Sequence, residues 1–259
     1  MTRLRFGTFN LLHGISVVDG RVRDGDLVTA AAALDADVLG IQEVDREQPR
    51  SGKVDQTTAV ADALGATWWR FAPALVGTPG ESWEAVDPNR TDQVDGASYG
   101  VGLVSRLEVL DWRSASFRPA PVGMPLFVPG RGLVHVADEP RAALAATVVG
   151  PDGPFTVATA HLSFVPGWNV WQLRQLVRWL APMPRPWMLL ADLNLPGPLP
   201  RLATGWRRLA RVPTYPSWRP RIQWDHVLTT ASATPRVAAV RAERLAVSDH
   251  CALLVDVDW

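Results

Sequence analysis

"LLADLNLP", residues 189–196, places an aspartate and an asparagine at the end of an apolar run. The run starts at Trp187 and is bounded by prolines, which is typical of a buried strand. An ionised carboxylate at the end of such a strand is costly unless a partner compensates its burial. A helix N-terminus, an arginine or a metal ion would each serve Asp192, and this stretch alone leaves the three alternatives open.

Five further apolar segments begin or end with polar side chains. These are Asn10, Glu43, His161, the pair Asp225 and His226, and the pair Asp249 and His250. A single residue of this kind is more often a cap or a hydrogen-bonded polar group of the core. Six such segments indicate a functional site, because sites in α/β folds are commonly built where strands end.

The chemistry of these side chains favours a hard metal ion and a phosphate. Glu43 is an oxygen ligand of the type that Mg²⁺ or Mn²⁺ prefers. The amides of Asn10 and Asn194 suit a metal-bound water or a phosphate oxygen. His161 and His250 can donate to phosphate or exchange protons near neutral pH.

Several familiar motifs are absent from the chain. Without CxxC or HExxH, a zinc site is not expected. The chain also has no GxxxxGK[ST] loop and no GxSxG elbow, which excludes the P-loop and α/β-hydrolase interpretations.

The bulk composition predicts an ordinary globular protein. The chain has 259 residues, no net charge and a single cysteine, so no internal disulfide forms. The N-terminus has no apolar signal core, and no apolar run reaches the roughly 20 residues of a membrane span. We expect a single domain over residues 1–259, a cytoplasmic location, no membrane insertion and a monomer.

Short strands alternate with helices along the sequence. We expect helices at 26–35, 56–64 and 168–180, and strands at 3–10, 37–42, 100–105, 107–113, 141–149, 154–161, 187–191, 225–230, 236–241 and 251–257. Residues 76–98 and 118–132 are rich in Gly and Pro and are expected as long loops beside a cleft. These loops carry Arg90, Arg118 and Arg131, which are too few to name a ligand.

Seven short motifs together resemble one known family. In order they are "GTFNLL", "IQEVD", "YGVGLVSR", "TAHLS", "ADLNLP", "WDHVL" and "SDHCALLVDV", and they span residues 7–257. Their order resembles the endonuclease/exonuclease/phosphatase superfamily, also called DNase I-like. The resemblance implies an α/β fold, a four-layer αββα sandwich of two packed mixed sheets flanked by helices. It also implies Mg²⁺-dependent hydrolysis of a phosphate ester, with Mn²⁺ as the other candidate cofactor.

The resemblance also implies roles for individual residues. Asn10, Glu43 and Asp249 match the metal site. Asp192 and Asn194 match the pair that orients the attacking water and supports the phosphate, and His161 matches a phosphate contact. His250 matches the histidine over the scissile phosphate, with Asp225 orienting it.

The chain departs from this pattern in two places. Many relatives carry an asparagine where Val101 stands, so a side-chain amide is missing, and the hydroxyl of Tyr99 is a candidate replacement. Some relatives pair the strand histidine with an upstream acid, but Glu81, Glu84 and Asp95 do not align with it.

Weaker signals leave alternatives open. Arg46 and Arg50 either bind substrate phosphate or belong to a solvated loop. His13 is expected at the surface, and the alternation of a strand turns His226 away from the site. The tryptophans at 168, 171 and 179 either pack in the core or form a platform on which bases stack.

We expect a phosphodiesterase or nuclease-type hydrolase. The substrate stays open between a nucleic acid, a phospholipid head group and a small phosphate ester. Zero net charge mildly disfavours a long polyanion. A non-catalytic phosphate-binding protein on the same fold is the alternative.

Overall fold

The structure is a computed structural model, and it describes residues 2–87, 94–128, 132–230 and 235–259. Its helices are α1 (Asp24–Leu34), α2 (Gln56–Leu64), α3 (Trp168–Leu180) and α4 (Leu199–Thr204), with 3-10 turns at Leu12–Gly14 and Pro49–Ser51. Its strands are β1 (Arg3–Asn10), β2 (Val38–Arg46), β3 (Trp68–Gly77), β4 (Trp83–Ala85), β5 (Ser98–Ser105), β6 (Val109–Phe117), β7 (Met124–Val128), β8 (Gly132–Val136), β9 (Arg141–Gly150), β10 (Gly153–His161), β11 (Trp187–Asp192), β12 (Arg207–Arg208), β13 (Asp225–Thr229), β14 (Arg236–Glu243) and β15 (Ala252–Asp258).

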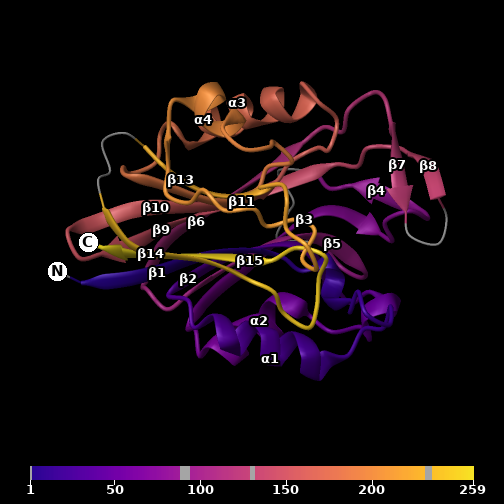
Figure 1. The fold of residues 1–259 in the computed structure, drawn as a ribbon, viewed down its shortest axis with the longest axis horizontal. Coiled ribbons are helices and arrows are strands. Elements are labelled where there is room, and N and C mark those ends of the chain that lie inside the picture. The colour runs from indigo at the N-terminus through magenta and orange to yellow at the C-terminus, as the bar shows by residue number, and fades with distance from the viewer. Residues whose placement is uncertain (1, 88–93, 129–131, 231–234) are drawn as a thin grey trace.

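Two large sheets pack face to face (Figure 1). One has seven strands in the order β14-β15-β1-β2-β5-β3-β4, and the other has six in the order β12-β13-β11-β10-β9-β6. Both are mixed, because β1 pairs with β2 and β10 with β11 in parallel, while the other neighbouring strands pair antiparallel. Phe6, Leu103, Leu144 and Phe155 are among the buried side chains between the sheets.

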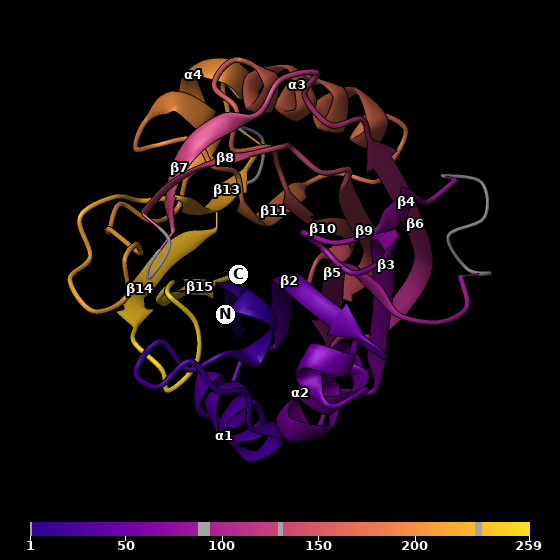
Figure 2. The same ribbon diagram turned by 90° about the vertical axis from the view of Figure 1, so that its right-hand side faces the viewer.

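Helices cover both outer faces, as Figure 2 shows. Leu27 and Leu34 of α1 and Val60 of α2 pack on the seven-stranded sheet. Leu173 and Leu176 of α3 pack on the six-stranded sheet. The structure therefore confirms the four-layer α/β sandwich. Among the described helices, none is long and apolar enough to cross a membrane.

Local sequence explains where the helices begin and end. The carboxylate of Asp55 accepts a hydrogen bond from the Thr58 amide and caps α2, and Gly65 in the left-handed region ends that helix. The observed bounds of α3 match the predicted 168–180.

Strand β3 was not predicted, although it lies inside the larger sheet. Its sequence, "WWRFAPALVG", contains Pro73, and a proline argues against a strand with two neighbours. The structure accommodates it through a register shift between Pro73 and Leu75. Sequence analysis also missed α4 and the short strand β4. The predicted loop 118–132 contains β7, which forms a separate hairpin with β8; Arg90 and Arg131 lie outside the described residues.

A polar bridge joins the two sheets beneath one edge of the sandwich. The Gln42 side chain accepts a hydrogen bond from Thr8 and donates to Thr159 Oγ1 at 2.9 Å and to the Leu190 carbonyl at 3.3 Å. A Cβ at Gly40 would lie 2.7 Å from Thr159 Oγ1 and 2.8 Å from the Leu190 carbonyl oxygen. The sheets therefore approach closely where β1, β2, β10 and β11 end.

Candidate active site

The first part of the site is a hydrogen-bonded group from both sheets. Asn10, at the end of β1, donates from Nδ2 to Glu43 Oε1 at 2.9 Å and to Asp192 Oδ2 at 3.0 Å. The Asn10 Oδ1 atom accepts from the Leu12 amide, which fixes the orientation of its amide group. One asparagine thus holds two carboxylates from opposite sheets.

Irregular backbone aims these side chains. Strand β2 shifts register against β5 between Ile41 and Val44, and Glu43 has φ 53°. Asn194 (φ 48°) and Ser248 (φ 75°) also lie in the left-handed region. Such conformations are costly for residues other than glycine and concentrate at functional sites.

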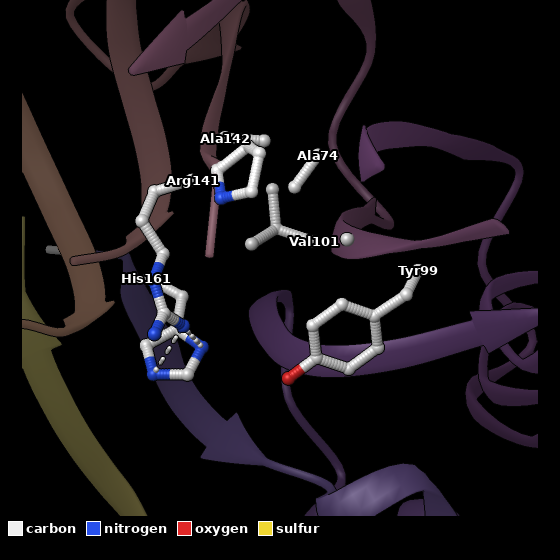
Figure 3. Close-up of a pocket in the computed structure, with 8 residues that line it drawn as sticks. Ala74, Tyr99, Val101, Arg141, Ala142 and His161 are labelled. Carbon is white, nitrogen blue, oxygen red and sulfur yellow. Dashed lines mark hydrogen bonds between the residues drawn. The ribbon is translucent and has the colours of Figure 1, made fainter. Parts of the chain in front are cut away.

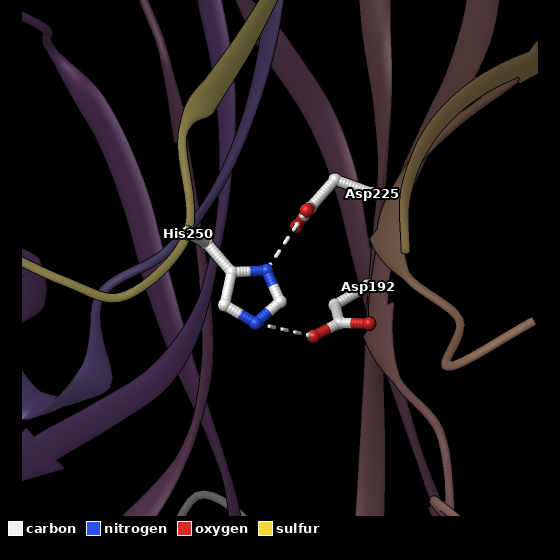
Figure 4. A group of neighbouring side chains, drawn as sticks. All are labelled: Asp192, Asp225 and His250. Carbon is white, nitrogen blue, oxygen red and sulfur yellow. Dashed lines mark hydrogen bonds and ion pairs between the residues drawn. The ribbon is translucent and has the colours of Figure 1, made fainter. Parts of the chain in front are cut away.

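The second part of the site is a buried histidine between two aspartates (Figure 4). His250 Nδ1 lies 2.8 Å from Asp225 Oδ2, and its Nε2 lies 3.9 Å from Asp192 Oδ2. Burial lowers the pKa of His250, but the charge of Asp225 and its hydrogen bond prevail and raise it to about 10. The ring of Tyr215 packs against the imidazole, with 5.0 Å between centroids.

The carboxylate of Asp192 lies at the centre of the group. Its Oδ1 accepts the Asn194 amide at 3.0 Å, and its Oδ2 lies 3.7 Å from His161 Nε2. Burial raises the pKa of Asp192 to about 7, against the opposing charge of His250. Burial also raises the pKa of Asp249, and the negative charge of Glu43 adds to this effect.

This donor set fits a divalent cation. Neighbouring carboxylates resist ionising together, and a bound cation stabilises their ionised forms. Oxygen ligands suit Mg²⁺ or Mn²⁺. Ligand atoms of Asp192, Asp225 and His250 also lie within 4.8 Å of one another. His250 is a poor ligand, however, because Asp225 favours its protonated form. Glu43, Asn10 and Asp249 stay the predicted metal ligands.

His161 contacts an arginine that sequence analysis did not identify. Arg141 Nη1 lies 3.3 Å from His161 Nδ1, and Arg141 Nη2 donates to Asp138 Oδ1 at 3.2 Å. Burial and the charge of Arg141 hold the pKa of His161 well below its usual range. Asp138 in turn accepts from Ser163 Oγ at 2.7 Å, so an acid does support the histidine, through a cation.

The sequence contained a signal for this arginine. "DEPR" precedes the buried strand 142–149, so Arg141 is also a polar residue where an apolar strand begins. The acids, amides and histidines at strand ends were the residues that the sequence singled out, and Arg141 was not among them. Glu81, Glu84 and Asp95 did not align with the family's upstream acid, and the acid that supports His161 is Asp138, three residues before β9.

A small cavity of about 10 Å³ lies beside this histidine (Figure 3). Tyr99, Val101, Arg141 and His161 line it, and the Tyr99 hydroxyl points toward the Arg141 and His161 side chains. That volume is about one water or one substrate oxygen. Val101 makes this wall apolar where relatives carry an amide, so the polar groups come from Tyr99 and Arg141.

The two predicted arginines differ in their surroundings. Arg50 donates to both carboxylate oxygens of Asp45, at 2.8 and 2.7 Å, and its guanidinium lies 5.5 Å from the Tyr99 ring centroid. Arg46 instead covers the Phe71 ring and donates to the Val94 carbonyl. The structure therefore brings Arg50 beside the cavity, and it shows no contact between Arg46 and the other predicted site residues.

Two further histidines were placed by sequence analysis outside the site. His226 is buried and its Nε2 lies 2.8 Å from the Leu195 carbonyl, away from Asp192. His13 was expected at the surface, but it is half-buried. Burial and the charge of Arg50 lower the pKa of His13 to about 4.

Comparison with known proteins identifies the family and the fold. The model of the endonuclease/exonuclease/phosphatase family matches residues 7–250. No curated protein matches the chain by sequence.

Solved structures share the fold at low sequence identity. An endonuclease/exonuclease/phosphatase from Beutenbergia cavernae has a TM-score of 0.68 at 23% identity, over 99% of this chain and 72% of that one. The mannosyl-6-phosphatase of Bacteroides thetaiotaomicron has a TM-score of 0.61 at 15% identity, over 99% and 100%. TDP2 of D. rerio, complexed with a single-strand DNA product, has a TM-score of 0.62 at 14% identity, over all of both chains.

Proposed function

Because the chain belongs to the endonuclease/exonuclease/phosphatase family, whose members hydrolyse phosphoesters, we propose that it is a phosphodiesterase dependent on Mg²⁺ or Mn²⁺. The observation that carries the proposal is the pairing of a protonatable histidine with one aspartate while it faces another. A binding protein would need the positive charge of His250, but it would gain nothing from the carboxylate of Asp192 beside that charge, which repels a phosphate.

The residues divide the work by charge. Glu43, Asn10 and Asp249 would hold the cation, which neutralises charge on the phosphate and lowers the pKa of a bound water. Asp192 orients the attacking water and accepts its proton, because burial raises the pKa of this carboxyl to about 7. The backbone N–H of Asn194 donates a hydrogen bond to Asp192 Oδ1 and holds that carboxylate in place.

On the other side of the phosphate, donors stabilise the developing charge. His250, held cationic by Asp225, donates from Nε2 to a phosphoryl oxygen. Arg141 and the Tyr99 hydroxyl donate to an oxygen that enters the small cavity. His161 stays neutral and positions Arg141 and Asn194.

Hydrolysis of bis(4-nitrophenyl) phosphate tests the reaction. We expect release of 4-nitrophenol with Mg²⁺ or Mn²⁺ and its loss with excess chelator. Asp192→Asn and His250→Ala should each lower kcat at least about 10²-fold. His135→Ala changes an exposed histidine of β8 and serves as the matched control. Saturable ester binding without turnover would instead identify a phosphate-binding protein.

A substrate panel separates the three ester classes. Plasmid DNA, single-stranded DNA, RNA, sphingomyelin, phosphoinositides and the small diester bis(4-nitrophenyl) phosphate are compared at equal phosphate concentration, each with metal and with chelator. A metal-dependent activity confined to phosphomonoesters would reject the diester assignment.

A further inference from the structure

The zero net charge of the chain hides a strong separation of charge. Residues 162–224 contain one acid, Asp192, which belongs to the candidate active site. The same stretch contains the arginines at 174, 178, 185, 201, 207, 208, 211, 219 and 221. Its excess of positive charge is balanced elsewhere, so neutrality of the whole chain does not describe the field at this face.

This basic stretch includes the helical layer over the six-stranded sheet. Helices α3 and α4 lie together on that side, at the top of Figures 1 and 2. Helix α3 contains no acid, and its Arg174 and Arg178 are exposed. Among the described residues, no acid forms an ion pair with either of them. Their charges therefore remain available to an anionic partner.

A groove of about 430 Å³ runs between this helix and the end of β6. Trp171, Gln175 and Trp179 form its helical wall, and Phe117 and Arg118 form the opposite wall. Trp171 is 37% exposed, and its ring stacks on Trp168 with 4.6 Å between centroids. The sequence left core packing and base stacking open for these tryptophans. Trp179 packs in part against the core beneath α3, whereas the exposed indole of Trp171 favours stacking.

The groove is tied to the candidate active site through the first turn of α3. Trp168 Nε1 and Gln172 Nε2 both donate to the Arg118 carbonyl at 3.0 Å. One residue further along, Asn169 Nδ2 donates to the carbonyl of Asn194 at 2.9 Å. The same helical turn thus fixes the groove wall and the loop that carries Asn194.

We propose that this tryptophan groove, with Arg118, Arg174 and Arg178, binds a single-stranded nucleic acid. Unpaired bases stack on exposed indoles while arginines contact the phosphates. From Trp171 to Trp179, the two tryptophans that line the groove, the helix rises about 12 Å, which spans roughly three to four stacked nucleotides at ~3.4 Å each. That the bound strand is also the substrate rests on the function proposed above.

The shape of the surface favours a strand over a lipid bilayer. A membrane-binding face inserts protruding apolar side chains into the headgroup layer. Here the tryptophans line a concave groove, and a bilayer cannot enter a concavity of this size. A base, by contrast, is a flat ring that fits beside an indole.

Binding is measured by fluorescence anisotropy of a labelled 15-nucleotide oligo-dT, with excess chelator so that no hydrolysis occurs. We expect the wild-type protein to bind, with an affinity that falls steeply as salt rises. Trp171→Ala should weaken binding roughly 10-fold or more. Trp68→Ala, which removes an indole of equal exposure (37%) from the opposite sheet, should have no effect.

The arginines give a second, independent readout. Replacing both Arg174 and Arg178 by Ala should reduce the slope of log Kd against log salt by about 1.4 for a single strand. The exposed Arg3, which pairs with Asp258, provides the control Arg3→Ala. An unchanged slope in the double variant would overturn the proposal, as would equal losses in Trp171→Ala and Trp68→Ala.

The two proposals fail in distinguishable ways. Hydrolysis of the small diester without oligonucleotide binding would reject the groove and leave the phosphodiesterase standing. Oligonucleotide binding without hydrolysis of any ester would reject the phosphodiesterase and leave the groove standing. If Trp171→Ala abolished binding to phosphatidylserine vesicles while the oligonucleotide did not bind, the face would be a membrane surface and the inference would be wrong.

Discussion

His250 Nδ1 and Asp225 Oδ2 lie 2.8 Å apart, although the two residues are separated by 25 positions in the chain. Asp225 begins β13 in one sheet, and His250 lies two residues before the start of β15 in the other. A carboxylate at this distance favours the imidazolium form and fixes the orientation of the ring. The positive charge of His250 therefore depends on the packing of the two sheets, which brings Asp225 next to it.

Asp225→Asn tests this contact through the pH–rate profile. The raised pKa of His250, about 10, keeps the ring cationic at neutral pH. Without the carboxylate that pKa falls, so kcat should drop and the alkaline limb should move to lower pH. The double variant with His250→Ala should be little slower than His250→Ala alone, because the two residues act as a unit. Multiplying losses, or an alkaline limb that does not move, would contradict the pairing.

The same pair predicts how stability depends on pH. The folded pKa of His250 is raised from its ordinary 6.5 to about 10, so the stabilisation is complete below about 6.5 and is lost as pH rises to 10. The difference in unfolding free energy between the wild-type protein and Asp225→Asn should shrink over that window. Urea titrations in chelator at pH 6, 8 and 10 measure it, and a constant difference would show that the carboxylate acts otherwise.

Metal binding should appear as thermal stabilisation. A cation that binds only the folded protein raises Tm with its concentration. We expect Mg²⁺ or Mn²⁺ to raise Tm in the wild-type protein and to have a much weaker effect in Glu43→Gln. Glu47→Gln, at an exposed position in the following loop, is the matched control. Equal metal-induced shifts in all three proteins would remove Glu43 from the metal site.

Arg141 should contribute to stability as well as to substrate binding. Arg141→Ala leaves the buried carboxylate of Asp138 without its cation, which typically lowers the free energy of unfolding by about 3–5 kcal/mol. Arg113→Ala breaks an exposed pair with Asp111 and should cost under about 1 kcal/mol. Urea denaturation compares the two, and similar small losses would show that Asp138 is held by Ser163 and the Ala120 amide alone.

The close approach of the sheets predicts a sensitive glycine. Gly40→Ala places a methyl group against Thr159 and the Leu190 carbonyl, and overpacking of this kind costs about 1–3 kcal/mol. Gly25→Ala, in α1 with no atom within 4 Å of the new Cβ, should stabilise by about 0.5–1 kcal/mol. Opposite signs in thermal unfolding are expected, and a neutral Gly40→Ala would mean that the sheets can separate there at little cost.

Several of the polar residues picked out at strand ends contact one another in the structure, because the topology brings such ends together. Asn10, His161 and Asp192 end β1, β10 and β11, which belong to two parallel strand pairs on opposite sheets, and Glu43 lies at the bulge of β2, the partner of β1. The bulge that turns Glu43 was not predictable, since it depends on the register between β2 and β5. Arg46 and Arg50 illustrate the same limit, because the loop fold determined which of the two lies near Tyr99.

Charge patterning was also misleading when taken over the whole chain. Zero net charge argued mildly against a polyanion, yet residues 162–224 contain nine arginines and a single acid. The structure adds that α3 and α4 of this stretch lie together over the outer face of the six-stranded sheet.

The hydrogen bonds from Gln42 to Thr159 and to the Leu190 carbonyl hold the two sheets in one relative position, and the proposed activity depends on that position. Asn10 and Glu43 move with one sheet, whereas Asp192 and Asp225 move with the other. If hydrostatic pressure or dilute urea shifted one sheet by about 1 Å relative to the other, kcat should fall strongly although every strand stays intact. Such a shift would be detected as a loss of activity at a lower pressure or urea concentration than the one that changes the far-ultraviolet circular dichroism signal.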